Sequence, residues 1–117
     1  VVALTLDADG RVTSAIGDMA EPALTIAADG GVTAPDTVRS KLELGDSYGM
    51  RNASSLGKEW YEQADAYAAW LVGKTAADVA AIETDSEAHN GPVDADIAAS
   101  CTMNVVEFNT AVEKALA

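Results

Sequence analysis

The chain has 117 residues, of which 49% are hydrophobic, and a formal net charge of -12. That length suits one domain with a single core, and no apolar run approaches the roughly 20 residues of a membrane-spanning helix. Seven Lys and Arg against 19 Asp and Glu exclude general attraction to nucleic acid or anionic lipid, because both require a basic surface.

The first residue is Val1 rather than an initiator methionine. We therefore expect a segment upstream, such as a secretory signal or a lipid anchor. Any association with a membrane is then expected to run through that upstream segment alone.

Two similar segments open the chain, at residues 3–15 (ALTLDADGRVTSA) and 23–35 (ALTIAADGGVTAP). Each is typical of a β-hairpin closed at Asp-Gly. A three-residue loop ending at Gly10, with Gly10 at positive φ, predicts that Leu6 lies opposite Val12 and Val2 opposite Ile16.

This register gives the first hairpin one apolar face. Its members are Val2, Leu4, Leu6, Val12 and Ile16. A two-residue Asp-Gly loop would scatter these side chains over both faces, which burial disfavours. The same reasoning places Ile26 opposite Val32, so we expect the two hairpins to form a four-stranded antiparallel sheet with one buried face.

Positive charge and glycine gather in residues 41–60 (KLELGDSYGMRNASSLGKEW). Residues 39–58 carry a net charge of +2, which leaves -14 for the rest of the chain. Glycines permit close backbone approach, free N–H groups and a helix start bind anions, and a tyrosine ring packs on a flat ligand. The candidate binding residues are Gly45, Tyr48, Gly49, Arg51, Gly57 and Lys58. The alternative is that the glycines only turn the chain, while the cations balance nearby carboxylates.

The apolar period becomes helical after the second hairpin. Over residues 58–72, Trp60, Ala64, Tyr67 and Leu71 form a stripe at helical spacing, and Gly73 ends the helix. Trp60 is therefore expected in the core.

Two further helices are predicted towards the carboxyl end. Thr75 and Asp78 form a capping box for a helix over residues 76–82, and a polar loop follows over 83–92. Asn104 and Glu107 are a capping pair ahead of a stripe of Val105, Phe108, Val112 and Ala115. Residues 100–105 are a fifth strand or the start of this helix. The fold class is α+β, with two or three helices packed on one face of an antiparallel sheet.

Four segments, in order along the whole chain, resemble the FMN-binding domain family, which includes the flavin-carrying subunits of sodium-pumping quinone reductases and related membrane redox complexes. They are LDADGRV, ELGDSYG, LVGKT and DIAASCTMNVVEFNTAVEKAL, which begin at residues 6, 43, 71 and 96. The chain is more closely similar to secreted or lipid-anchored bacterial proteins that carry LGD.YGM and GKEWYEQ, here at residues 44–50 and 57–63.

The resemblance implies a role for Thr102. In the family, the last segment has an aspartate, then Ser-Gly-Ala-Thr, and the threonine carries FMN through a phosphoester attached by a separate transferase. Asp96 and Thr102 match, whereas Ala99, Ser100 and Cys101 stand in place of Ser-Gly-Ala. The missing glycine removes backbone freedom that an exposed acceptor turn would use. The implied ligand is therefore non-covalent FMN or a similar phosphate-bearing molecule, with covalent attachment at Thr102 as the alternative.

The expected function is that of an extracytoplasmic bacterial domain that binds a small ligand or carries a flavin. The alternative is a structural or protein-interaction module of a cell-surface protein without a small ligand. The expected partners are accordingly a small molecule, or a surface or redox protein. No catalytic triad, phosphate-transfer loop or acid-base dyad is recognisable, so no catalytic activity of its own is predicted. His89 has no second His or Cys ligand beside it, so no metal site is predicted.

Overall fold

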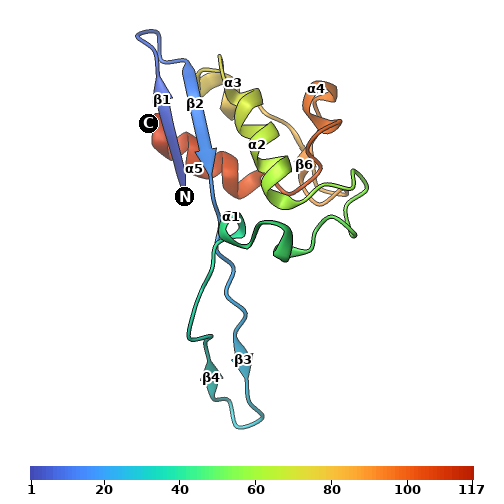
Figure 1. Ribbon diagram of the computed structural model, residues 1–117. Coiled ribbons are helices and arrows are strands. Elements are labelled where there is room, and N and C mark those ends of the chain that lie inside the picture. Colours follow the sequence, from blue (N-terminus) through green and yellow to red (C-terminus); the bar gives the residue numbers. More distant parts are fainter.

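The computed structural model describes residues 1–117 and has five α-helices and three two-stranded antiparallel sheets (Figure 1). This composition confirms the predicted α+β class. The strands are β1 (Val2–Leu6), β2 (Val12–Gly17), β3 (Thr25–Ile26), β4 (Val32–Thr33), β5 (Thr84–Asp85) and β6 (Gly91–Pro92). The helices are α1 (Lys41–Leu44), the 3-10 helix η1 (Gly45–Tyr48), α2 (Trp60–Leu71), α3 (Ala76–Ala80), α4 (Ala95–Ala98) and α5 (Val106–Leu116).

The first hairpin has the predicted turn. Gly10 adopts φ 75°, the N–H of Asp7 donates to the carbonyl of Arg11 (2.9 Å), and Leu6 pairs with Val12. A positive φ costs glycine little and an L-residue more, so Asp-Gly selects this loop.

The register beyond the turn differs from the prediction. A bulge at Thr13 shifts the pairing, so Val2 lies opposite Gly17 and Ile16 opposite Ala3. Because successive side chains alternate between faces, one extra residue turns Ile16 outwards, where it is 55% exposed. The core-facing side chains of this hairpin are Val2, Leu4, Val12 and Ala15.

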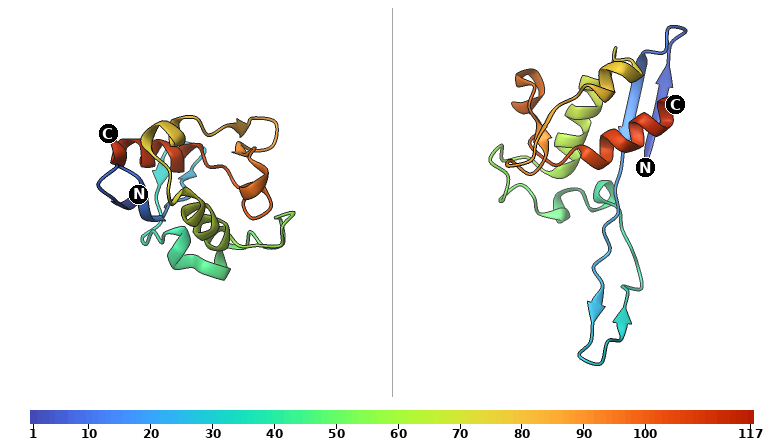
Figure 2. Two further views of the ribbon diagram at one scale, coloured as in Figure 1. Left: turned by 90° about the horizontal axis from the view of Figure 1, so that it is seen from above. Right: turned by 180° about the vertical axis from the view of Figure 1, so that it is seen from behind.

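The core lies between this hairpin and the helices. Helix α2 packs against β2, while α5 packs against β1 and α3 (Figures 1 and 2). The predicted stripe of α2 is buried in full, and Gly73 follows its end at φ 88°. The buried hydrophobic residues are Trp60, Ala64, Tyr67, Ala68, Leu71, Val79, Ile97, Cys101, Met103, Val105, Phe108 and Val112.

The caps of the later helices agree largely with the prediction. Thr75 and Asp78 form the capping box of α3. At α5 the Asn104 Oδ1 accepts from the N–H of Val106 (3.0 Å), but the predicted return bond from the Asn104 N–H to the Glu107 side chain is absent and Val105 is the residue before the first turn. Ala115 is exposed, and the apolar stripe of α5 continues from Val112 to Leu116, which is partly buried against the core.

The second hairpin does not join the first, so the predicted four-stranded sheet is wrong. Residues 20–39 form an arm that leaves the body and carries β3 and β4 at its far end (Figure 1). The edge of β2 is bonded at Val12 to the turn at Gly73 and Lys74. Beyond β2, Asp18 Oδ1 accepts from the N–H of Leu42 and the Met19 carbonyl from that of Lys41, which directs the chain away from the sheet.

Of the two alternatives for residues 100–105, the fifth strand is absent, and the segment instead leads into α5, with Val105 as the residue before its first turn. These residues form an irregular segment between α4 and α5, while the third strand pair, β5 with β6, lies in the expected polar loop. None of the helices is both apolar enough and long enough to span a lipid bilayer.

Candidate functional site

The glycine-containing segment forms a chain of turns that leads into α2. Gly45, Gly49 and Gly57 have φ of 50°, 84° and 64°, a region that L-residues seldom adopt. No atom lies within 4 Å of a side chain built on any of the three. They are therefore required by backbone conformation rather than by close approach of another group.

The backbone N–H groups of these turns bind an anion, which is a carboxylate of the protein itself. The two carboxylate oxygens of Glu59 accept the N–H groups of Met50 and Arg51, each at 3.0 Å. Glu59 is 2% exposed and is the residue before the first turn of α2. Its own N–H donates to Glu62 Oε2 (2.8 Å). The backbone donors predicted to bind a ligand phosphate are thus occupied by an internal carboxylate.

The cations of the segment differ in their partners. Arg51 Nη2 lies 2.9 Å from Asp46 Oδ1 and 3.1 Å from Glu62 Oε2. The hydrogen bond to Asp46 raises the pKa of the Arg51 guanidinium. Lys58 forms no ion pair. Arg51 therefore balances carboxylates, as the alternative interpretation expects, whereas Lys58 does not.

The aromatic residues of the segment hold another cation. Lys41 is buried, and its Nζ lies 5.1 Å from the centre of the Tyr48 ring and 5.3 Å from that of Trp60. Its ammonium also pairs with Glu21 at 3.0 Å. Cation-π contact stabilises a desolvated ammonium. Tyr48 is thus partly buried against the core, and Trp60 lies in the core as predicted.

A cavity of about 480 Å³ opens beside the end of this segment. Its volume is in the range of small-molecule sites. No carboxylate lines it, although the chain has 19 Asp and Glu, and His89 is its one ionisable side chain. The lining residues are Met50, Ala53, Ser54, Ser55, Gln63, Ala88, His89, Thr102 and Met103.

Gln63 of α2 joins the two loops that enclose this cavity. Its Oε1 accepts the N–H groups of Thr102 (2.9 Å) and Met103 (3.2 Å). Its Nε2 donates to Ser54 Oγ and to the carbonyl of Lys58, each at 3.1 Å. Because the amide is buried and uses both ends, it fixes residues 54–58 against residues 102–103.

Thr102 lies at the wall of the cavity with its backbone held and its hydroxyl loosely bonded. The hydroxyl is 3.5 Å from Gln63 Oε1 and the residue is partly exposed. A side chain at Gly91 would come within 2.8 Å of the Thr102 carbonyl oxygen, so Gly91 permits this close packing. The turn before Gly91 is tight, because His89 and Asn90 both have positive φ.

Of the sequence-predicted site residues, Thr102 alone lines the cavity. Gly45, Tyr48, Gly49, Arg51, Gly57 and Lys58 belong to the turns beside it, and Met50, Ser54 and Ser55 of the same loop form its wall instead. The sequence prediction missed Glu59 and Gln63. Gln63 was detectable, because it is a polar residue three positions after Trp60 and four before Tyr67, within the buried stripe.

Cys101 is not a reactive thiol, and His89 belongs to no metal site. Burial raises the pKa of the Cys101 thiol to about 11, so it is neutral at ordinary pH and a poor nucleophile. No group of three His, Cys, Asp or Glu side chains is placed to hold a metal ion.

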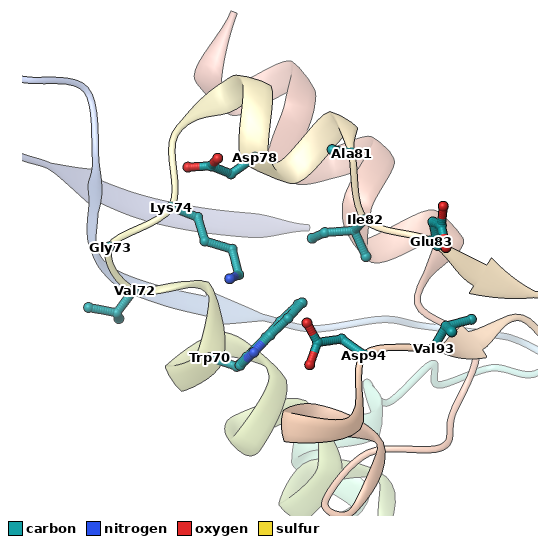
Figure 3. Close-up of a pocket in the computed structure, with 10 residues that line it drawn as sticks. All are labelled: Trp70, Val72, Gly73, Lys74, Asp78, Ala81, Ile82, Glu83, Val93 and Asp94. Atoms are coloured by element: carbon teal, nitrogen blue, oxygen red, sulfur yellow. The ribbon is translucent and has the colours of Figure 1, made fainter.

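A second cavity, of about 640 Å³, lies between the end of α2, α3 and the start of α4 (Figure 3). Lys74 lies with its Nζ 3.9 Å from the centre of the Trp70 ring. Two of the carboxylates that line this cavity cap helices. Asp78 accepts a hydrogen bond from the N–H of Thr75, and Asp94 accepts one from the N–H of Asp96. Hydrogen bonds from Thr75 lower the pKa of Asp78. These polar groups therefore have structural partners, and no sequence-predicted site residue lines this cavity.

Comparison with known proteins gives one short similarity. A segment of 40 residues is 48% identical to a chlorophenol reductase from Desulfitobacterium hafniense. The match covers 34% of this chain and 12% of that protein. No family model matches the chain. No solved structure matches it either.

Proposed function

We propose that this chain is an extracytoplasmic bacterial domain that binds FMN or a similar phosphate-bearing ligand in the cavity beside Thr102. The observation that carries the proposal is the lining of that cavity, which combines Thr102 with the end of the glycine segment and excludes every carboxylate. In a chain of charge -12, such a surface lacks the local carboxylates that would repel the phosphate of a ligand. The relationship of this chain to the FMN-binding domain family is likewise proposed here.

The lining residues suit the two halves of such a ligand. Met50, Ala53 and Met103 offer an apolar surface to a flat ring. Ser55, Thr102 and the exposed His89 offer hydrogen-bond donors to a phosphate. Bound FMN would supply electron transfer, which accords with the name of the chlorophenol reductase.

Covalent attachment at Thr102 is a further step within this proposal. Its hydroxyl has one long contact, to Gln63, and is partly exposed. An acceptor hydroxyl must be reachable by a transferase, and these properties support that role. The side chains of Ala99, Ser100 and Cys101 in place of Ser-Gly-Ala remain the departure from the family pattern.

The second candidate is a structural or protein-interaction module of a cell-surface protein, with no small ligand. Glu59 is the observation that favours it, because its carboxylate occupies the backbone donors of the glycine turns. The ion pairs of Arg51 have the same implication. Under this candidate, the glycine segment serves the fold alone.

A pair of serine substitutions tests the location of the ligand. Both Ser47 and Ser55 are exposed, but only Ser55 lines the cavity. We expect Ser55→Glu to weaken FMN binding about tenfold or more, because it adds a negative charge beside the phosphate, and Ser47→Glu to leave it unchanged. Calorimetric titration with FMN and with riboflavin measures both effects. A larger loss of FMN affinity in Ser47→Glu than in Ser55→Glu would indicate that FMN binds at the glycine turns and not in the cavity.

Covalent attachment is tested separately by expression together with a flavin transferase. If Thr102 is the acceptor, in-gel flavin fluorescence appears in the wild type and in Thr110→Val, a surface control on α5, but not in Thr102→Val. Binding without fluorescence indicates a non-covalent site. A protein that neither fluoresces nor gives heat with FMN belongs to the second candidate.

A further inference from the structure

The arm of residues 20–39 has no packing partner in the molecule. Every residue of this range is exposed, and β3 and β4 pair only with each other (Figure 2). An isolated two-stranded hairpin is marginally stable in water. Its outer edges also present unpaired backbone groups to any further strand.

One face of the arm is apolar. Ile26 and Val32 pair directly and are 72% and 63% exposed. Leu24, two residues before Ile26, is 58% exposed. Thr25 and Thr33, which also pair, occupy the opposite face. The hairpin is thus amphipathic although both of its faces meet solvent.

The first hairpin shows what such a face does when it is packed. Its sequence repeats that of the arm, and its turn has the same form, with Gly10 and Gly30 at φ 75° and 85°. The residue that corresponds to Val32 is Val12, which is 1% exposed. Leu4, the counterpart of Leu24, is partly buried, whereas Leu6, the counterpart of Ile26, is 45% exposed. The arm therefore displays a surface that its repeat buries in part.

Charge limits the kind of partner that the arm accepts. The arm carries Arg39 and Glu21 at its base, where Glu21 pairs with Lys41, whereas the rest of the arm holds Asp29 and Asp36 and no Lys or Arg. A second copy would bring the same carboxylates and a net charge of -12 against these, and an anionic membrane would repel them. An apolar strand with Lys or Arg at its ends complements both the face and the charge.

We propose that the arm is a docking element for another protein, to which it binds by pairing with an apolar sheet edge flanked by basic residues. Asp29 at the tip and Asp36 towards the base face the partner's cations, while Ile26 and Val32 cover its apolar side chains. The base of the arm is fixed to the body by the Lys41–Glu21 ion pair and by the bond from the Lys41 N–H to the Met19 carbonyl. Docked main-chain pairing supplies affinity, and the side chains supply selectivity.

The test uses a defined strand peptide and the whole chain. We expect the peptide Lys-Lys-Val-Thr-Val-Thr-Val-Lys-Lys, titrated into isotope-labelled protein, to shift amide resonances of residues 23–34 and to slow their hydrogen exchange. The same peptide with Glu for each Lys should not bind, and added NaCl should weaken the basic peptide.

Matched variants assign the effect to the arm. Ile26→Ser with Val32→Ser should weaken peptide binding about tenfold or more, whereas Val72→Ser with Val93→Ser, which removes two exposed valines of the body, should not. Shifts centred outside the arm, equal binding of the Glu peptide, or equal effects of the two double variants would overturn the proposal. So would arm shifts caused by phosphatidylcholine or phosphatidylglycerol vesicles, or dimers that disappear with Ile26→Ser and Val32→Ser.

Discussion

At the residue scale, the Glu59 side chain is the group that binds the backbone donors of the glycine segment. Its carboxylate accepts two adjacent backbone N–H groups while it is buried. Hydrogen bonds to a charged acceptor are stronger than those between neutral groups. The side chain thereby joins the turns at residues 49–51 to the start of α2 and satisfies donors that would otherwise need a ligand or water.

Glu59→Ala should expose this dependence. The substitution leaves the N–H groups of Met50 and Arg51 without an acceptor, which we expect to lower the free energy of unfolding by about 2 to 4 kcal/mol. Acetate or phosphate should restore part of the loss, since either anion can accept the same donors. Urea unfolding in increasing acetate, corrected with chloride at equal ionic strength, measures both changes.

Asp65→Ala is the matched control for Glu59. Asp65 lies on α2, carries the same charge and is exposed. Its substitution should change stability little and give no acetate response. An acetate response equal in both variants would mean that the anion acts on net charge rather than at the vacated position.

At the element scale, the two hairpins share a sequence and a turn but differ in what they contact. The first packs on α2 and α5, and its buried Gly17 would place a side chain 2.2 Å from a ring carbon of Phe108. The second contacts only its own strands beyond its base. Loss of structure in the first hairpin therefore affects the core, whereas loss in the second does not.

Gly10→Ala and Gly30→Ala are expected to differ although both glycines have positive φ. Alanine in that region costs on the order of 1 kcal/mol. At position 10 this cost should appear in global unfolding by urea. At position 30 it should appear only as faster hydrogen exchange in β3 and β4, with the urea midpoint unchanged. Equal midpoints for the two variants would show that the hairpins are coupled.

At the scale of the whole molecule, the arm sets the shape. The principal extents are 54 × 30 × 25 Å, with a radius of gyration of 15.9 Å, and the arm forms the long axis (Figure 1). A single domain of about 100 residues has a typical radius of about 13 Å. The excess is consistent with a body that carries an extended arm.

Removal of the arm should therefore change shape without changing stability. We expect replacement of residues 23–37 by a short Gly-Ser link to leave the free energy of unfolding within about 0.5 kcal/mol, because no buried contact is lost. The radius of gyration from small-angle X-ray scattering should fall. A loss of stability well above that range would place the arm against the body in solution.

The local elements were predictable because their determinants lie within a few residues of one another. The buried stripe of α2 repeats every three or four positions, and Thr75 forms hydrogen bonds with Asp78 within one turn. Gly10 adopts the positive φ that closes its own hairpin loop. Gln63 also carried a local signal, as a polar side chain on a buried face. Thr102 was predicted as a site residue from its resemblance to the family motif and not from the spacing of apolar residues.

The tertiary structure alone decided which of these elements share a surface. The same hairpin sequence packs once and stands free once, because packing depends on what the chain bonds next to it, here Asp18 with Leu42 and Val12 with Gly73. The turn after Gly49 offers the backbone N–H groups of Met50 and Arg51 as donors. Glu59 reaches them only because α2 begins where it does. The cavity beside Thr102 arises in the same way, because Gln63 binds the backbone of Thr102, which is 39 residues away in the sequence. Local spacing encodes conformation and burial, whereas hydrogen-bond partners distant in sequence are set by the packing of whole elements.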